Sequence, residues 1–112
     1  MDKSLFEIDK KILSAINLNK PIVALESTLI SHGLPYPQNI KVAESSIKAV
    51  EKSGAVAATI AVIKGKIKIG LNKKDINILA KSKNVEKVSR HNLALALNNK
   101  INAATTVAST MY

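Results

Sequence analysis

Apolar residues near the start of the chain recur every three or four positions and then merge into a continuous run. The recurring positions are Leu5, Ile8, Ile12 and Ile16. This spacing predicts an amphipathic helix over residues 4–18. Pro21 follows, and residues 22–25 are all apolar. An uninterrupted apolar run of this length is typical of a strand that is buried on both faces.

A second helical pattern begins after Pro37, which suits the first turn of a helix because proline lacks an amide hydrogen. The side of this helix that we expect to be buried consists of Val42, Ala43, Ser46, Ile47, Ala49 and Val50. Gly54 is expected to end this helix, since glycine readily adopts the left-handed backbone that follows many helices. A loop of residues 28–37 therefore separates the predicted strand from this helix.

Two further apolar runs, residues 58–63 and 66–69, flank the pair Lys64-Gly65. The second run alternates apolar and basic residues, as a strand with one solvated face does. Because a two-residue connection that contains glycine favours a tight turn, the two runs predict a β-hairpin.

The rest of the chain alternates helical and extended patterns. Asn72, with Asp75 three positions later, resembles a capping box at the start of a helix. The apolar positions of that helix are Ile76, Leu79 and Ala80. Residues 85–88 then predict a short strand, and the helix-like segment after it carries Leu93, Leu95 and Leu97.

The predicted order is helix, strand, helix, hairpin, helix, strand, helix. This order indicates an α/β fold with a mixed sheet flanked by helices, an α/β/α sandwich. The last residues, 104–112, are rich in alanine and threonine and end without a capping signal. We therefore expect residues 1–112 to be the N-terminal portion of a single α/β domain, and the sandwich to be incomplete.

The formal net charge of +9 raises the question of a nucleic-acid partner. All basic residues except Arg90 are lysines, and they are spread along the chain. Arginine is the residue that usually reads phosphates and bases. The aromatic residues that stack on bases are few: Phe6, Tyr36 and Tyr112. The composition therefore favours a solvated lysine surface and no nucleic-acid partner.

The chain has no cysteine, so it forms neither disulfides nor thiolate metal sites. Its apolar runs fall well short of the roughly 20 residues that span a bilayer. The start of the chain lacks the pattern of a secretory signal peptide. We expect a cytoplasmic protein with no membrane partner.

Polar side chains gather directly after the predicted strand of residues 22–25. Glu26 comes first and is followed by two hydroxyl residues, Ser27 and Thr28. A carboxylate at the mouth of an apolar pocket suits a general acid or base. The alternative is a strand-end glutamate that caps nearby amides or lies in solvent. His32 either binds a substrate or forms a hydrogen bond within the loop.

A second group of polar residues follows the short strand of residues 85–88. Lys87 lies close in sequence to Ser89 and Arg90, and such a cluster can bind a phosphate. An ordinary surface lysine is the alternative. The hydroxyls and backbone amides of residues 105–110 could serve as an anion site at the start of a helix. The glycine-rich patterns of nucleotide-binding loops do not occur.

Five segments in this order resemble the pseudouridine-5'-phosphate glycosidase family, also called the indigoidine synthase A-like family. They are residues 21–28 (PIVALEST), 31–39 (SHGLPYPQN), 54–61 (GAVAATIA), 87–90 (KVSR) and 104–111 (ATTVASTM). Their order and spacing match from about residue 20 to the end of the chain. Five collinear motifs are far more specific than any one of them.

The resemblance implies an α/β/α fold, a homotrimer and a divalent metal, typically manganese. It implies reversible cleavage of the C–C glycosidic bond of pseudouridine 5'-phosphate to uracil and ribose 5-phosphate in nucleoside catabolism. In such enzymes a lysine forms a Schiff base with the opened sugar and a glutamate transfers a proton. Glu26 matches the proton donor, Lys87 a lysine expected at the substrate phosphate, and Val107 a backbone position that contacts substrate.

Members of this family are more than twice as long as this chain. The 112 residues end before the family's Schiff-base lysine and its metal-binding aspartate, so we expect no metal ligand within them. The alternative to an enzyme is a non-catalytic truncated or split-gene fragment that acts, if at all, with a partner chain.

Overall fold

The computed structural model describes residues 3–112, so residues 1 and 2 of the expected domain lie outside the described part. The strands are β1 (Phe6–Ile8), β2 (Ile22–Leu25), β3 (Val56–Ile63), β4 (Lys66–Ile69), β5 (Glu86–Val88) and β6 (Ala103–Thr105). The α-helices are α1 (Lys10–Asn17), α2 (Gln38–Lys52), α3 (Lys73–Lys81), α4 (Leu93–Asn98) and α5 (Val107–Met111). Short helical turns are η1 (Lys3–Leu5), η2 (Leu29–Gly33) and η3 (Arg90–Asn92).

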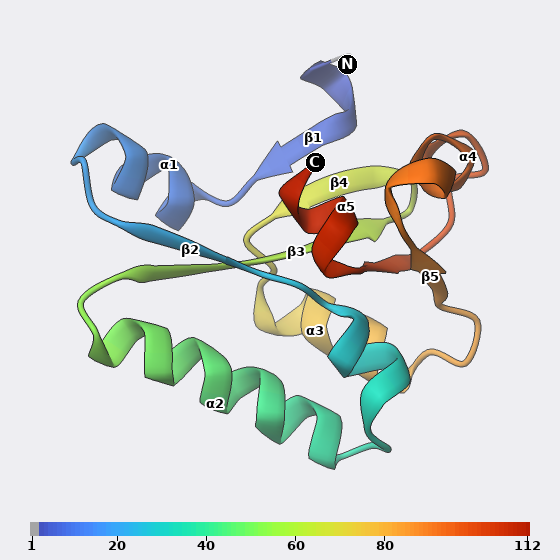
Figure 1. Cartoon of the computed structure of the whole chain (residues 1–112), viewed down its shortest axis with the longest axis horizontal. Helices are drawn as coiled ribbons and strands as arrows, with labels where there is room; N and C mark the ends of the chain where they lie inside the picture. The colour runs from blue at the N-terminus through green and yellow to red at the C-terminus, as the bar shows by residue number, and fades with distance from the viewer. Residues whose placement is uncertain (1–2) are drawn as a thin grey trace.

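The strands form one mixed sheet around β3, which confirms the α/β fold class (Figure 1). The order is β1-β4-β3-β6-β5, and β2 also pairs with β3. β3 is long enough to pair with different strands along its length. Its first half pairs in parallel with β2, whereas its second half pairs antiparallel with β4 and β6. No helix of residues 3–112 is long and apolar enough to cross a membrane.

β2 and β6 meet end to end beside β3. β2 pairs with Val56 to Thr59, and β6 pairs with Ala61 and Val62 in the opposite direction. The amide of Ser27, just after β2, donates a hydrogen bond to the carbonyl of Thr105, the last residue of β6 (3.0 Å). The carboxyl ends of two oppositely directed strands therefore converge in the middle of the molecule.

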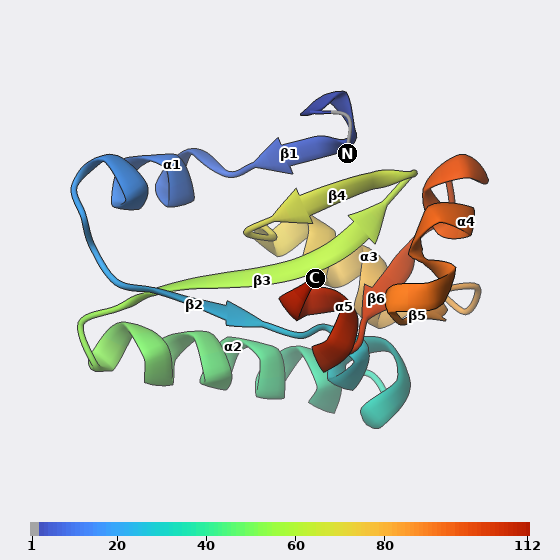
Figure 2. The same ribbon diagram turned by 45° about the horizontal axis from the view of Figure 1, so that its top comes forward.

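Helices cover both sides of the sheet (Figure 2). One buried cluster joins α2 and α3 to β3 and includes Ala43, Ile63 and Leu79. A second cluster packs α4 against the sheet and includes Val62 and Leu97. These two aliphatic clusters show the arrangement of an α/β/α sandwich.

The predicted helix over residues 4–18 is wrong in its first half. Phe6 to Ile8 form β1, which pairs in parallel with Ile67 to Ile69 of β4. The helix α1 begins only after Asp9, whose side chain accepts a hydrogen bond from the amide of Lys11 (3.3 Å). Pairing with a strand some sixty positions away has outweighed the local helical spacing, as tertiary contacts often do.

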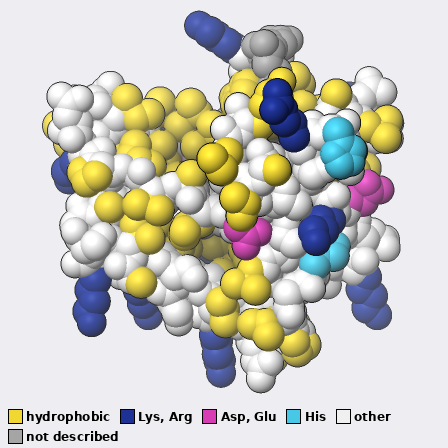
Figure 3. Space-filling view, viewed as in Figure 1, with side chains coloured by type: hydrophobic (Ala, Val, Ile, Leu, Met, Phe, Trp, Pro, Cys, Tyr) yellow, Lys and Arg dark blue, Asp and Glu magenta, His cyan; other side chains and the backbone are white. Residues whose placement is uncertain are grey.

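The strand predicted at residues 22–25 is confirmed, but its burial on both faces is wrong. Val23 is 40% exposed, and Ala24 is exposed as well. Within the described part of the chain β2 pairs with β3 only, so its other edge carries no strand. Apolar side chains gather on the surface around α1 and β2 in Figure 3.

Local sequence signals correctly predicted the limits of α2, the β3–β4 hairpin and the start of α3. Pro37 directly precedes α2, and Gly54 adopts the positive φ of 91° expected after a helix end. β3 and β4 form the predicted hairpin, with positive φ at both Lys64 and Gly65. The capping box of Asn72 and Asp75 is present with both of its hydrogen bonds. The segment 104–112, which carried no clear signal, contains the end of β6 and α5.

Candidate active site

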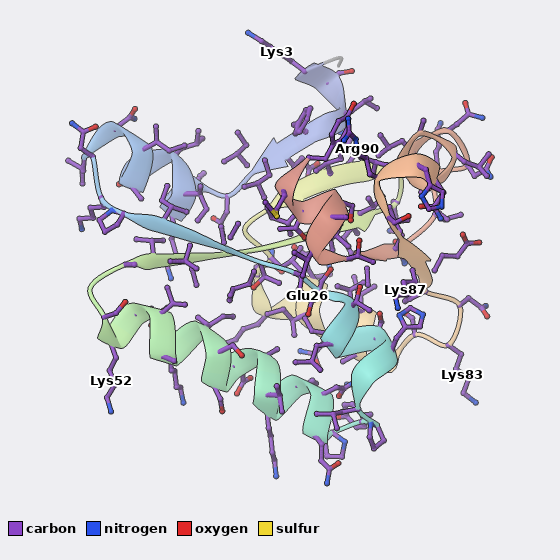
Figure 4. All side chains as sticks on the ribbon, viewed as in Figure 1. Lys3, Glu26, Lys52, Lys83, Lys87 and Arg90 are labelled. Atoms are coloured by element: carbon purple, nitrogen blue, oxygen red, sulfur yellow. The ribbon has the colours of Figure 1, made fainter. Side chains whose placement is uncertain are left out.

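Glu26 lies at the junction of the converging strands, immediately after β2 (Figure 4). It is half-buried, and its Oε2 accepts a hydrogen bond from the amide of Thr28 (2.9 Å). This contact fixes the carboxylate at the start of the turn η2. The Oγ1 of Thr28 is buried and has no hydrogen-bond partner within the described residues. A buried hydroxyl without a hydrogen-bond partner is uncommon in folded proteins.

Buried hydroxyls join the two strand ends behind Glu26. Ser27 is fully buried, and its Oγ accepts a hydrogen bond from the amide of Thr105 (2.8 Å). The Thr105 hydroxyl donates to the carbonyl of Ile60 (2.6 Å). Because a hydroxyl has one proton, the hydroxyls of Ser27 (3.3 Å) and Thr110 (2.8 Å) must donate to Thr105 Oγ1. These hydrogen bonds join β2, β3, β6 and α5 to one another.

Further hydroxyls attach α5 to β5. The Ser109 hydroxyl donates to the carbonyl of Val88 (2.8 Å), which also accepts from the amide of Thr106 (3.0 Å). Thr106 caps α5 by accepting from the amide of Ser109 (3.3 Å). The hydroxyls of Thr105 and Ser109 therefore hold the fold together, and an anion site at residues 105–110 stays a prediction. Val107, the first residue of α5, is 61% exposed.

Lys87 lies on the same side of the molecule as Glu26 (Figure 4). It is exposed on β5 and pairs in register with Ala104, the neighbour of Thr105. Arg90 does not join this pair, because its guanidinium lies over the ring of Tyr112, 4.9 Å from the ring centre. Figure 4 shows Arg90 well away from both Glu26 and Lys87. The structure therefore separates the lysine from the arginine that the sequence placed beside it.

The histidines form short-range contacts within their own loops. His32 Nδ1 lies 2.6 Å from the Ser31 hydroxyl, and His91 Nδ1 lies 2.9 Å from the Ser89 hydroxyl. The His32 contact favours the interpretation in which this residue organises its loop. Among residues 3–112, no three histidine, aspartate or glutamate side chains lie close enough to hold a metal ion.

Asn39 positions the turn after Glu26, a role that the sequence did not reveal. Its side chain is 3% exposed and donates to the carbonyls of Ile30 in η2 (2.8 Å) and Ala80 in α3 (3.0 Å). Its Oδ1 accepts from the amide of Ile40 (2.9 Å). A polar residue at a helix start was a weak signal, because the spacing alone does not show which carbonyls it reaches.

A cleft of about 470 Å³ lies apart from these residues, between α1, α2 and α3. Its lining includes Ile12, Ile47 and Thr59, but neither Glu26 nor Lys87. The cleft is therefore not part of the candidate site.

Comparison with known proteins places these features in a recognised group. The profile of the family described as "Indigoidine synthase A like protein" matches residues 11–112. The chain is 52% identical over 105 residues to a pseudouridine-5'-phosphate glycosidase of Petrotoga mobilis, covering 94% of this chain and 34% of that protein. It is 48% identical over 108 residues to the Escherichia coli protein of the same name, covering 96% of this chain and 35% of that protein.

Solved structures agree with the sequence matches. A prealnumycin C-glycosynthase, crystallised with ribulose 5-phosphate, superposes with a TM-score of 0.85 at 36% identity. That match covers 99% of this chain and 35% of the other. An indigoidine synthase A-like protein of Thermotoga maritima gives 0.80 at 27% identity, covering 95% and 34%. The chain spans about a third of the length of the relatives it matches.

Proposed function

The chain belongs to the indigoidine synthase A-like family, and we propose that it is the N-terminal part of a pseudouridine-5'-phosphate glycosidase. In this proposal residues 1–112 contribute to a single α/β domain whose remainder lies in further chain. The reaction adds water across the C–C glycosidic bond of pseudouridine 5'-phosphate and yields uracil and ribose 5-phosphate.

The position of Glu26 is the observation that carries this proposal. When the C–C bond breaks, the uracil carbon that leaves the sugar must gain a proton, and no heteroatom is available to accept it. A positioned acid meets this need. Glu26 is half-buried at the strand junction and oriented by the Thr28 amide, so it can hold a proton at a defined place. In the reverse reaction the Glu26 carboxylate accepts the proton that this uracil carbon loses when the C–C bond forms.

Lys87 is proposed to bind the substrate phosphate. It is exposed on the same side as Glu26, and it forms no ion pair within the described residues. A lysine ammonium binds phosphate as a point charge. The C-glycosynthase relative was crystallised with ribulose 5-phosphate, another five-carbon sugar phosphate, which supports this class of ligand. Val107, exposed at the start of α5, is proposed to contact substrate through its backbone.

Other parts of the proposed enzyme require residues beyond this chain. Among residues 3–112 no three histidine, aspartate or glutamate side chains lie close enough together to hold a metal ion. In this proposal the manganese ligands and the Schiff-base lysine therefore come from the rest of the protein. The homotrimeric assembly, the cytoplasmic location and the role in nucleoside catabolism belong to the same proposal. The alternative is a non-catalytic fragment that acts, if at all, with a partner chain.

The proposal is tested by joining this chain to the part of the Petrotoga mobilis relative that it does not match. We expect the fusion, supplied with manganese, to release ribose 5-phosphate from pseudouridine 5'-phosphate, and the chain alone to release none. Glu26→Gln should lower kcat by at least about 100-fold, since general acid–base catalysis contributes roughly 10²–10⁴-fold.

Glu44→Gln is the matched control, because Glu44 is exposed on α2 and does not belong to the strand junction. It should leave the rate unchanged. A folded fusion without activity would contradict the proposed function, and a fully active Glu26→Gln fusion would remove Glu26 from the mechanism.

A further inference from the structure

The outer edge of β2 is an unprotected sheet edge. Proteins usually protect such edges with charged residues, proline, bulges or a covering element, because exposed backbone groups attract another strand. The four residues of β2, Ile22–Leu25, are all apolar, and the nearest proline, Pro21, lies just outside the strand. Val23 and Ala24 are both exposed. Nothing within this strand prevents another strand from pairing with it.

The elements around β2 continue this apolar surface. α1 and α5 both contact β2, and each exposes large apolar side chains. On α1 these are Leu13 and Ile16, which are 45% and 52% exposed. On α5, Met111 is 81% exposed. Figure 3 shows apolar side chains over α1 and β2 with few charges among them, whereas lysines project from the margin. Exposed apolar side chains that gather on one face of a protein are typical of an interface.

We propose that the β2 edge and the apolar surface beside it bind the rest of a family-length polypeptide, which adds a strand to β2. The proposal rests on the proposed function, since it names the partner that would complete the same site. The matched region covers only 34% of the Petrotoga mobilis relative, so the larger part of that protein's chain is available to pack against this unit. The unprotected edge is the place where its backbone can form hydrogen bonds as well as apolar contacts.

A second copy of this chain fits the surface less well. Each 112-residue chain alone has a net charge of +9, which opposes direct pairing of two such isolated chains at this edge. Glu26 follows β2 directly, so a strand added at this edge would lie next to the candidate site and could complete it.

Hydrogen exchange tests where the added chain binds. The probe is the rest of the Petrotoga mobilis relative, fused to this chain as a single polypeptide, and the isolated chain is the reference. In the fusion we expect the backbone amides of residues 22–25 to exchange at least ten-fold more slowly. Amides of β4, which pairs with β1 and β3, should change little. Unchanged exchange in β2 would overturn the proposal, as would a fusion that does not fold.

A charged substitution on the edge gives an independent test. Val23→Lys should leave the melting midpoint of the isolated chain nearly unchanged, since the side chain is already exposed, but lower that of the fusion clearly. Leu95→Lys is the matched control, because Leu95 is 62% exposed on α4 and lies outside this surface. Equal effects of Val23→Lys on the chain and the fusion would overturn the proposal.

Two further results test the identity of the docking partner and the proposed reaction independently of each other. If the isolated chain dimerises and Val23→Lys abolishes the dimer, the partner is a second copy and the proposed one is wrong. If β2 is protected in the fusion but no ribose 5-phosphate is released, the docking surface stands and the proposed function fails. All exchange and melting measurements are made without substrate or metal.

Discussion

At the scale of single residues, Lys87 and Lys83 form a matched pair for testing the phosphate site. Both are exposed lysines near β5, but Figure 4 shows Lys83 pointing away from Glu26. In the active fusion we expect Lys87→Met to raise KM for pseudouridine 5'-phosphate about 10-fold or more, because a charge-assisted hydrogen bond contributes roughly 1.5–3 kcal/mol. Lys83→Met should leave KM unchanged. Steady-state kinetics measures KM for both variants. Equal effects of the two substitutions on KM would rule out a phosphate contact at Lys87.

A second residue-scale prediction concerns the ion pair between Lys68 and Asp75. The Lys68 Nζ lies 3.1 Å from Asp75, which is 4% exposed, and 3.3 Å from Glu7. Burial alone would lower the pKa of Lys68, but the hydrogen bonds and charges of Asp75 and Glu7 outweigh it and raise the pKa above 10.5. The stability that this pair contributes is therefore complete below pH 10.5 and is lost as the pH rises through the folded-state value.

Lys68→Met tests this linkage. It leaves Asp75 buried without its cation and should lower the free energy of unfolding by about 1–3 kcal/mol at neutral pH. The variant should also lose less stability than the unmodified chain as the pH rises from about 9.5 to about 12. Urea unfolding at each pH gives both quantities. Lys41→Met, at an exposed position on α2, is the control. Parallel pH curves for all three proteins would contradict the linkage.

At the scale of elements, Asn39 connects three pieces of secondary structure. From the first turn of α2 it holds the carbonyls of Ile30 in η2 and Ala80 in α3. Asn39→Ala removes both hydrogen bonds. The carbonyls of Ile30 and Ala80 must then accept from water or remain without a hydrogen bond. We expect a loss of about 2–4 kcal/mol in the free energy of unfolding, at about 1–2 kcal/mol for each carbonyl.

The loss should be accompanied by faster hydrogen exchange in η2. Gln38→Ala is the neighbouring control, because Gln38 is exposed and should change the free energy of unfolding by no more than about 0.5 kcal/mol. Urea unfolding and exchange of the Ile30 amide measure the two effects. A stable Asn39→Ala variant with unchanged exchange would show that η2 is held by other contacts.

At the scale of the whole molecule, the charge of +9 is spread over lysines on several elements. Such a surface binds any polyanion weakly, and the affinity falls as the salt concentration rises. We expect binding to a short single-stranded RNA to be weaker than about 10⁻⁶ M at physiological salt and to be independent of sequence. Fluorescence anisotropy across a salt series measures this. Tight or sequence-dependent binding in about 0.15 M salt would contradict the absence of a nucleic-acid partner.

Local sequence signals determined much of this fold, because they depend on neighbouring residues. Pro37 and Gly54 mark the limits of α2, Lys64-Gly65 forms the hairpin turn, and Asn72 caps α3. Each signal acts through a backbone angle or hydrogen bond a few positions away. The sequence motifs likewise identified the family and directed attention to Glu26, although its catalytic role stays a prediction.

Only the tertiary structure decided how these elements meet. β1 and β6 have three residues each, too few for a periodic signal, and their partners lie far away in sequence. The antiparallel pairing of β6 with β3 brings Thr105 against Ser27 and places the strand ends head to head. Burial of β2 could not be inferred from its composition, since burial depends on the neighbours that a strand has. An apolar run indicates that a strand needs covering, and the fold of this chain leaves its outer edge uncovered.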